Sequence, residues 1–352
     1  MSKIKVAVLG VGDCCSSLVQ GVSSYNNGDF VGIKFNDFGG YKPSDIQFTA
    51  AFDIDSLKVG KELSEAIFAK TNRYEKVNGV EPLGVTVQKG EVMDGLGEFL
   101  QNQIKVDKKP SVNVSEELKK SKTEIVINFV PTGAVQASKW YAEQALKAGC
   151  AFINATPTEI ASSKDWAARF EKAKLPLVGD DIMNQIGATI LHKTLLEFLV
   201  ERGVKIDETY QLDIGGGTES LVTLEKARGD IKREVKRRAL QASIPYEVPI
   251  TAGTTDYVDF MKNTRDSYFW ISGRYFNNTP VKIDITLRTV DAPNSSSILM
   301  DAIRGVKIAL DRKVYGTIDT LCAYGFKKPP KFFSPTETEQ MINEYIEGKR
   351  NR

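Results

Sequence analysis

Residues 4–21, IKVAVLGVGDCCSSLVQG, constrain the fold of this chain more than any other stretch. An apolar run with the composition of a strand ends in Gly10-Val11-Gly12, and a helical pattern follows at once. In this context Gly10 permits a tight turn and Gly12 lets the backbone approach a pyrophosphate, while the positive end of the next helix favours the anion. The third glycine of the usual fingerprint is replaced by Cys15. We therefore expect a dinucleotide site here, with an ordinary βα turn as the alternative.

The composition is that of a soluble globular protein, and it argues against several kinds of partner. A length of 352 residues predicts two domains, each large enough for a core. Lysine and arginine total 47 against 45 aspartate and glutamate residues, so the net charge of +2 favours neither a nucleic-acid nor a membrane partner. The sequence shows no secretory leader, no membrane-spanning run, and no disulfide or metal spacing among its four cysteines. We therefore expect a protein of the reducing cytoplasm.

The first part of the chain alternates strands and helices. Strand patterns occupy 46–55, 124–133, 151–157 and 174–181, and helical patterns follow at about 134–148 and 185–202. This order predicts a Rossmann-like α/β fold, a doubly wound parallel sheet whose ligands lie at the carboxyl ends of the strands. The segments expected to meet at that edge are Gly10–Asp13, Asp53, Val130–Gly133, Asn154–Pro157 and Gly179–Asp181.

Asp53 ends the second predicted strand, where an acidic residue normally binds the adenosine ribose of a dinucleotide. It lies farther from the glycine loop than the usual spacing of about 20 residues, so the intervening segment must be an insertion. Capping of a helix before Leu57 is an alternative role, compatible with the first.

The pattern changes after Arg202. Strand-like stretches at 209–217, 267–276 and 281–293 predict a mostly antiparallel sheet in an inserted α+β domain, with a charged helical segment at 221–241 between them. A long helix begins at about Asn294, a good N-cap, and an acidic amphipathic helix lies near 336–347. We expect residues 1–202 with 294–352 to form one domain and 203–293 the other.

Two constellations could hold catalytic groups. Lys232 and Lys236 lie four apart in KARGDIKREVKRR, so on a helix they share a face, either at the edge of a buried pocket or as a solvated basic surface. Asp180 and Asp181 directly follow a strand, where they could bind a divalent cation, act as acid and base, or cap a helix.

The thiols beside the glycine loop and the single histidine are interpreted as structural. Cys14 and Cys15 lie near a helix N-terminus, which can activate a thiol, but small residues that pack a helix onto a sheet are the favoured interpretation. His192 lies in an apolar helical pattern, and one histidine cannot make a multi-histidine metal site.

Together these motifs resemble the myo-inositol-1-phosphate synthase family, in particular its archaeal and bacterial branch. The resemblance spans about Ile4 to Pro330 and rests on GVGDCCSSLVQG, AAFDID with KVGKEL, NATPTEIAS, GDDIMNQIGATI, YQLDIGGG and ISGRYF…DAPNSSSILMDAIRGVKIALDR. It implies NAD in the first domain, a homotetramer, and a sugar phosphate, D-glucose 6-phosphate, as substrate. The implied product is 1L-myo-inositol 1-phosphate, formed by oxidation at C5, enolisation, intramolecular aldol closure and re-reduction.

The resemblance also assigns site residues by position. It gives Lys232 and Lys236 oxyanion and proton-transfer roles, gives Lys327 an electrostatic role, and has Asp291 orient a lysine. Asp181 is the fifth catalytic candidate, and a divalent cation near Asp180 and Asp181 stays open. The cofactor-binding candidates are Gly10, Gly12, Asp13, Cys14, Asp53, Pro131, Thr132, Asn154, Thr156 and Asp180.

Some positions depart from the family pattern. Met183-Asn184 replaces a Lys-Ser pair, Thr264 or Arg265 stands where a further lysine is expected, and Asp213 replaces an asparagine. An arginine can hold a phosphate but is a poor proton shuttle. Two alternatives therefore stay open: a related NAD-dependent enzyme acting on another sugar phosphate, and a non-catalytic NAD-binding homologue.

Overall fold

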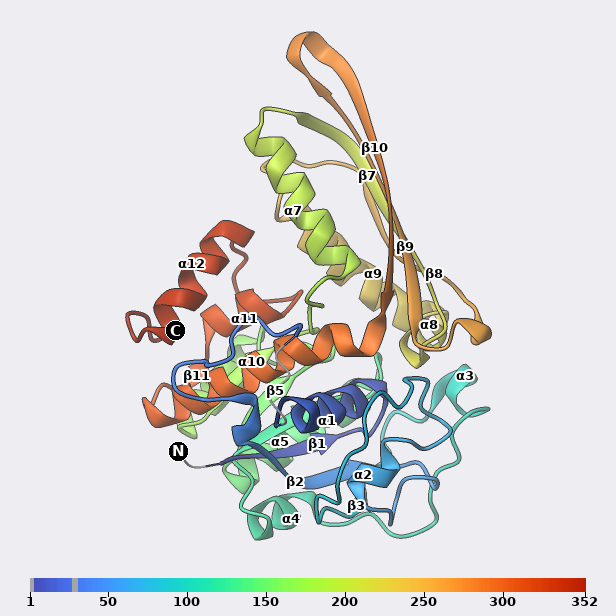
Figure 1. Cartoon of the computed structure of the whole chain (residues 1–352), viewed down its shortest axis with the longest axis vertical. Helices are drawn as coiled ribbons and strands as arrows, with labels where there is room; N and C mark the ends of the chain where they lie inside the picture. Colours follow the sequence, from blue (N-terminus) through green and yellow to red (C-terminus); the bar gives the residue numbers. More distant parts are fainter. Residues whose placement is uncertain (1–2, 27–30) are drawn as a thin grey trace.

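A computed structural model describes residues 3–26 and 31–352, and within them the chain forms two regions (Figure 1). The first region is built on a seven-stranded parallel sheet in the order β11-β6-β5-β4-β1-β2-β3. Its strands are β1 (Ile4–Leu9), β2 (Ile46–Asp53), β3 (Val87–Lys89), β4 (Ile125–Asn128), β5 (Ala151–Asn154), β6 (Pro176–Gly179) and β11 (Gly316–Thr317). The predicted Rossmann-like fold is confirmed.

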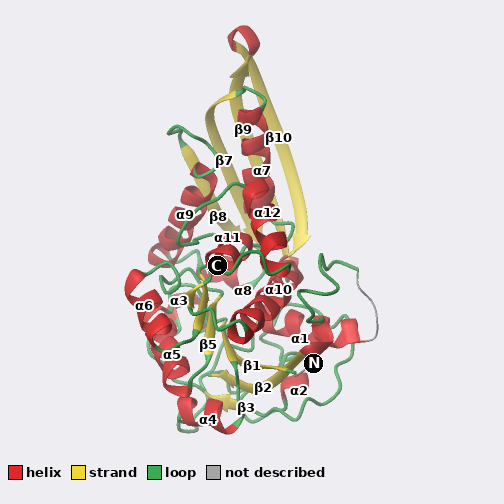
Figure 2. Cartoon of the chain, turned by 90° about the vertical axis from the view of Figure 1, so that its left-hand side faces the viewer, coloured by secondary structure: helices red, strands yellow, loops and turns green. Residues whose placement is uncertain are grey.

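Helices cover both faces of this sheet, and for that reason its central strands are continuous apolar runs. Every residue of β4, β5 and β6 is buried. Figure 2 shows α4 (Val114–Lys120), α5 (Val135–Ala148) and α6 (Lys164–Lys172) on one side, with α1 (Asp13–Asn26) and α10 (Asp291–Asp311) on the other. The glycine loop therefore joins a buried strand to a helix packed on the sheet.

The second region is a four-stranded sheet in the order β10-β9-β7-β8. Its strands are β7 (Lys205–Gly215), β8 (Ile250–Tyr257), β9 (Thr264–Tyr275) and β10 (Thr279–Val290). They pair antiparallel except β7 with β8, so the mostly antiparallel prediction is confirmed, although β8 itself was missed. The sheet packs through Leu196, Leu199 and Leu240 on α7 (Ala188–Glu201) and α9 (Lys226–Gln241), and the β9–β10 hairpin extends beyond them (Figure 1).

The start of α10 differs from the prediction. The helix begins at Asp291 with Val290 as its N-cap, so Asn294 lies inside the first turns and the predicted cap is wrong. Instead, the Asn294 side chain accepts a hydrogen bond from Ile186 N–H at 2.7 Å and donates to Ile186 O at 2.8 Å. Pro293 is tolerated because a first-turn residue has no intrahelical partner for an N–H.

The remaining helices are short or terminal. They are α2 (Leu63–Ala66), α3 (Gly97–Leu100), α8 (Thr218–Val222), α11 (Asp319–Gly325) and α12 (Pro335–Ile346), with 3₁₀ turns at Pro43–Asp45, Asp259–Met261 and Phe276–Asn278. The predicted terminal helix is α12, which begins with a capping box between Ser334 and Glu337. Among the described residues, no helix combines the length and the apolar character needed to cross a membrane.

Candidate active site

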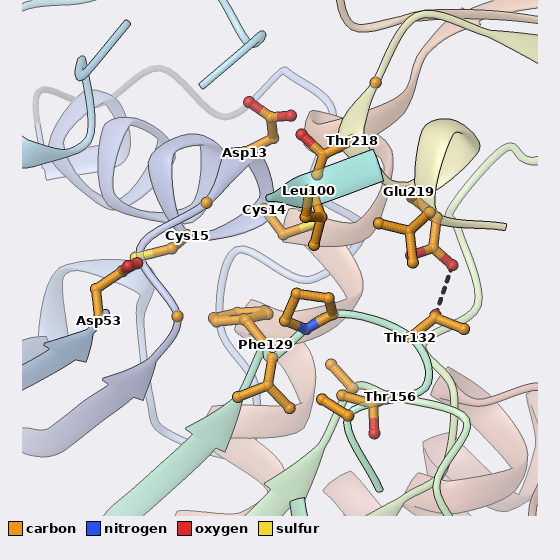
Figure 3. Close-up of a pocket in the computed structure, with 18 of the residues that line it drawn as sticks. Asp13, Cys14, Cys15, Asp53, Leu100, Phe129, Thr132, Thr156, Thr218 and Glu219 are labelled. Carbon is orange, nitrogen blue, oxygen red and sulfur yellow. Dashed lines mark hydrogen bonds between the residues drawn. The ribbon is translucent and has the colours of Figure 1, made fainter. Parts of the chain in front are cut away.

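A cavity lies between the carboxyl edge of the parallel sheet and the second region. Figure 3 shows Cys14, Asp53, Thr132 and Thr156 from the first region facing Thr218 and Glu219 from the second. The predicted site residues that line this cavity are Gly10, Gly12, Asp13, Cys14, Asp53, Pro131, Thr132, Thr156, Lys232, Asp291 and Lys327. Those that do not line it are Asn154, Asp180, Asp181 and Lys236.

The glycine loop is shaped for close approach. Gly10 has a φ of +88°, and a Cβ there would lie 3.0 Å from Phe129 O, whereas a Cβ on Gly12 would meet no atom within 4 Å. Gly12 therefore leaves open space at the N-terminus of α1, where an anion is favoured. Between them, Val11 N–H donates to Asp53 Oδ2 at 2.6 Å, so the loop is fastened to the end of β2.

Backbone N–H groups of the loop orient the Asp53 carboxylate, and Asp53 does not cap a helix. Its Oδ1 accepts from the N–H groups of Ile54 and Asp55 at 2.7 and 2.8 Å. No helix begins at Leu57, since the next one is α2 with Glu62 as its cap, so the alternative capping role is wrong.

Asp13 and Cys14 are half-buried at the cavity, whereas Cys15 is buried. Asp13 accepts from the backbone of Arg73 and Tyr74 at 2.6 and 2.8 Å; burial raises the pKa of this carboxyl, and the two hydrogen bonds oppose that rise. Burial raises the pKa of the Cys14 thiol to about 12 and that of Cys15 still further. Both thiols therefore stay protonated near neutral pH, as expected of packing residues.

Asp180 and Asn154 form a buried network behind the cavity wall. The Asp180 carboxylate accepts from Asn154 Nδ2 at 2.7 Å, from Ile160, Ala161 and Ser162 N–H at 2.9–3.0 Å, and from Ser162 Oγ at 2.8 Å. Burial raises the pKa of Asp180, and these donors oppose the rise. The network fixes the loop after β5, which carries Thr156 into the cavity.

Lys232 lies between two carboxylates that come from different elements. Its Nζ is 2.7 Å from Asp181 Oδ1 and 2.9 Å from Glu219 Oε1, and Glu219 also accepts from Thr132 Oγ1 at 2.8 Å (Figure 3). Burial alone would lower the pKa of Lys232, but the attraction of the two carboxylates outweighs it and raises that pKa. Glu219 was not predicted from the sequence, because no spacing rule singles it out in GGGTESL.

The positive charge of Lys327 is less well balanced by nearby carboxylates than that of Lys232. Its Nζ donates to Ile182 O at 2.7 Å and lies 3.4 Å from the same Asp181 oxygen that Lys232 holds at 2.7 Å. Burial lowers the pKa of Lys327 to about 8; Asp181 opposes this, while Lys232, Lys236 and Arg265 add to it. An amine that titrates near neutral pH can act as an acid or a base.

Lys236 stands behind the cavity wall and is ion-paired with Asp213. The predicted shared face of Lys232 and Lys236 therefore turns into the protein, since the two residues are only 8% and 2% exposed. The solvated basic surface is ruled out as an interpretation of these two lysines.

Arg228 joins the two regions and was also missed. Its guanidinium donates to Thr132 O at 2.7 Å and pairs with Glu225 at 2.7 Å, while its side chain lies over Gly133. The loop after β4 is thereby held by α9.

Comparisons with known proteins identify the family of this chain. Residues 187–292 match the family model described as myo-inositol-1-phosphate synthase. The inositol-3-phosphate synthase of Mycolicibacterium smegmatis is 39% identical over 357 residues, covering 98% of this chain and 98% of that protein. The inositol-3-phosphate synthase of Mycobacterium tuberculosis is 38% identical, covering 99% of this chain and 96% of that protein. The chain belongs to the myo-inositol-1-phosphate synthase family.

The family assignment made from the motifs is confirmed, and a solved structure agrees with the fold. A myo-inositol-1-phosphate synthase-related protein from Thermotoga maritima aligns with a TM-score of 0.82 over 98% of both chains, at 23% sequence identity. This likeness shows a shared fold.

Two of the departures from the family pattern, Asn184 and Arg265, meet at Asp291. Arg265 Nη2 lies 2.8 Å from Asp291 Oδ2, and Asn184 Nδ2 donates to Asp291 Oδ1 at 3.1 Å. Arg265, not Thr264, therefore occupies the cavity, since Thr264 is exposed and bonds to Met261 O. Met183 is buried away from the cavity. The side chain that pairs with Asp291 is thus an arginine, where the resemblance implied a lysine.

A divalent cation is not supported. Among residues 3–26 and 31–352, no group of three or more histidine, cysteine, aspartate or glutamate side chains could hold a metal ion. The two candidate carboxylates are also separately engaged, Asp180 by five donors and Asp181 by two lysines.

Proposed function

We propose that this protein is an inositol-3-phosphate synthase, an isomerase that converts D-glucose 6-phosphate to 1L-myo-inositol 1-phosphate with NAD as its cofactor. Relatives with that name match nearly the whole chain. The observation that carries the proposal is one cavity that joins a glycine loop to Lys232, Lys327 and Arg265. This combination suits a dinucleotide-dependent reaction of a phosphorylated sugar.

The residues of the first region fit NAD. Gly12 leaves a cradle that a Cβ would fill, and the N-terminus of α1 opens onto it. Asp53 lies at the end of β2, where a carboxylate binds the adenosine ribose. The chemistry that bound NAD supplies is reversible hydride transfer.

The residues of the second region and its surroundings supply fixed charge and a proton acceptor. Lys232, held by Asp181 and Glu219, presents a positive charge to an oxyanion that develops on the sugar. Lys327 can exchange a proton near neutral pH. Asp291 orients Arg265, whose guanidinium suits a phosphate.

The test is incubation of the protein with glucose 6-phosphate and substoichiometric NAD. We expect an acid-stable, periodate-sensitive phosphate ester and no accumulation of NADH, because the hydride returns to the sugar. Lys232→Met should abolish turnover, whereas Lys226→Met, on the exposed face of the same helix, should not. Absence of product with NAD bound would overturn the proposal, and stoichiometric NADH would indicate an enzyme that stops at oxidation.

The Arg265–Asp291–Asn184 group favours one second candidate, the same chemistry on another sugar phosphate. A panel of aldose and ketose phosphates in the same assay separates the two by kcat/KM. We further propose a homotetramer, which light scattering after size-exclusion chromatography tests. The cytoplasmic location stays a prediction.

A further inference from the structure

Lys236 and Asp213 form a buried ion pair that the proposed mechanism does not use. Their side chains are only 3% and 1% exposed, and neither residue lines the cavity. The pair joins α9 to the middle of β7, directly behind the wall that carries Lys232.

Every other contact of the Asp213 side chain also suits an ionised carboxylate. Ser267 Oγ donates to Oδ1 at 2.7 Å, and Gln211 Nε2 donates to both oxygens at 3.2 and 3.0 Å. Burial would raise the pKa of Asp213, but the positive charges of Lys236 and Arg265 outweigh it and lower that pKa to about 2. A carboxylate surrounded by donors gives a buried ammonium the counterion that it requires.

Among the described residues, Asp213 is the carboxylate that pairs directly with Lys236, and both lysines that contact Asp181 do so through Oδ1, which leaves its Oδ2 without a hydrogen-bond partner. Asp181, the next carboxylate that interacts with Lys236, is engaged by Lys232 at 2.7 Å and Lys327 at 3.4 Å. Five further charged or titratable groups surround the pair. They come from α7, α8, α9, β9 and the loop after α11, and are His192, Glu219, Lys232, Arg265 and Lys327. Burial lowers the pKa of His192 to about 4, so it is neutral near pH 7.

Lys327 contrasts with the other two lysines. Lys232 has two carboxylates within 2.9 Å and Lys236 pairs with Asp213, whereas the hydrogen-bond partners of Lys327 among the described residues are a carbonyl and, at 3.4 Å, a carboxylate that it shares with Lys232. It also lines the cavity, which Lys236 does not.

We propose that Asp213 is a positioning residue that holds Lys236 as a fixed cation behind the cavity wall, leaving Lys327 as the lysine that exchanges protons with the substrate. This assignment rests on the proposed synthase function and changes the roles that the sequence resemblance implied for Lys236 and Lys327. Asp213 acts through Lys236 and does not touch the cavity.

The proposal makes a prediction about Asp213→Asn, which keeps the shape of the side chain and removes its charge. Lys236 then faces Arg265, Lys327 and Lys232 without a counterion of its own, and burial favours the neutral amine. We therefore expect the protonated fraction of Lys236 to fall in this variant. Loss of that charge weakens the repulsion that keeps the Lys327 pKa low, so Lys327 should titrate at higher pH.

The test is an NMR titration of the full chain labelled with ¹³C at lysine Cε, whose shift follows the charge of the amine. Lys236→Met and Lys327→Met assign the two signals. In the wild type we expect Lys327 to titrate near pH 8. In Asp213→Asn, and in Lys236→Met, which removes the charge outright, Lys327 should titrate at higher pH. Ser267→Ala, which removes a neutral donor from the same carboxylate, and Asp213→Glu, which keeps the charge, should leave the titration of Lys327 unchanged.

Two results would overturn the proposal: a Lys327 signal that titrates at the same pH in Asp213→Asn as in the wild type, or one that Lys236→Met leaves unmoved. The Lys236→Met result does not depend on the folding of any variant at position 213. In kinetics with glucose 6-phosphate, the rising limb of kcat/KM should move to higher pH in Asp213→Asn, and identical profiles would refute the role. If the protein turns over no glucose 6-phosphate, the proposed function fails, while the titration still decides the role of Asp213.

Discussion

Replacement of Lys232 by methionine tests the electrostatics of the site most directly. The substitution keeps much of the apolar stem and removes the ammonium that lies 2.7 Å from Asp181 and 2.9 Å from Glu219. At an effective dielectric constant of 20, each of these attractions is worth about 6 kcal/mol before desolvation. Removing one partner of a buried ion pair typically costs about 3–5 kcal/mol of unfolding free energy, because the other charge stays buried. We expect a loss in that range at pH 7.

The variant should also reverse the pH dependence of stability. In the wild type, the folded pKa of Lys232 is raised, so its contribution is present below the unfolded pKa and is lost only in strong alkali. The folded pKa values of Asp181 and Glu219 are lowered. Their contribution to stability is therefore present above about pH 4 and is lost as the pH falls through the folded pKa values. Without Lys232, burial raises the pKa of Glu219 above its unfolded value. The folded variant then binds protons, and its stability should rise as the pH falls from about 7 to about 5.

Urea unfolding of both proteins at about pH 5, 6, 7 and 8 measures this. Lys226→Met is the matched control, because Lys226 is exposed on the same helix, and it should change the unfolding free energy by less than about 0.5 kcal/mol. A loss below about 1 kcal/mol in Lys232→Met, or a pH slope equal to that of the wild type, would refute the reasoning.

Three further predictions concern the walls of the cavity. Asp180→Asn should lower the free energy of unfolding in urea by about 2–4 kcal/mol, because the NH₂ group of the new amide would face buried N–H donors. Gly133→Ala (φ +87°, with a Cβ 2.6 Å from Arg228 Cγ) should destabilise the chain more than Gly149→Ala, which has a φ of +80° and open space; equal losses would exclude a role for the Arg228 contact. Cys14 should resist iodoacetamide at pH 7.5 in the folded protein and react in urea, as followed by mass spectrometry, because burial raises its pKa to about 12.

The sequence was sufficient for five of the seven strands of the parallel sheet, but not for its short edge strands β3 and β11, nor for β8 of the second sheet. Strands such as β4 and β5 are buried on both faces, so their apolar composition alone identifies them. β8 was missed because ITAGTTDY is rich in threonine and glycine and is exposed over part of its length. The start of α10 was displaced because Asp291-Ala292-Pro293 has the composition of a turn, although each of these residues is tolerated in the first turn of a helix.

The candidate site shows a different limit. Helical spacing correctly places Lys232 and Lys236 on one face, but their counterions come from the loop after β6, from α8 and from β7, and no local rule connects these segments. The structure brings four cations, Lys232, Lys236, Arg265 and Lys327, together with four carboxylates, Asp181, Asp213, Glu219 and Asp291. Lys327 lies farthest from a carboxylate, 3.4 Å, and shares that carboxylate with Lys232, so its charge is the one that can change. Sequence identifies which residues are present, whereas this unequal sharing of charge exists only in the folded chain.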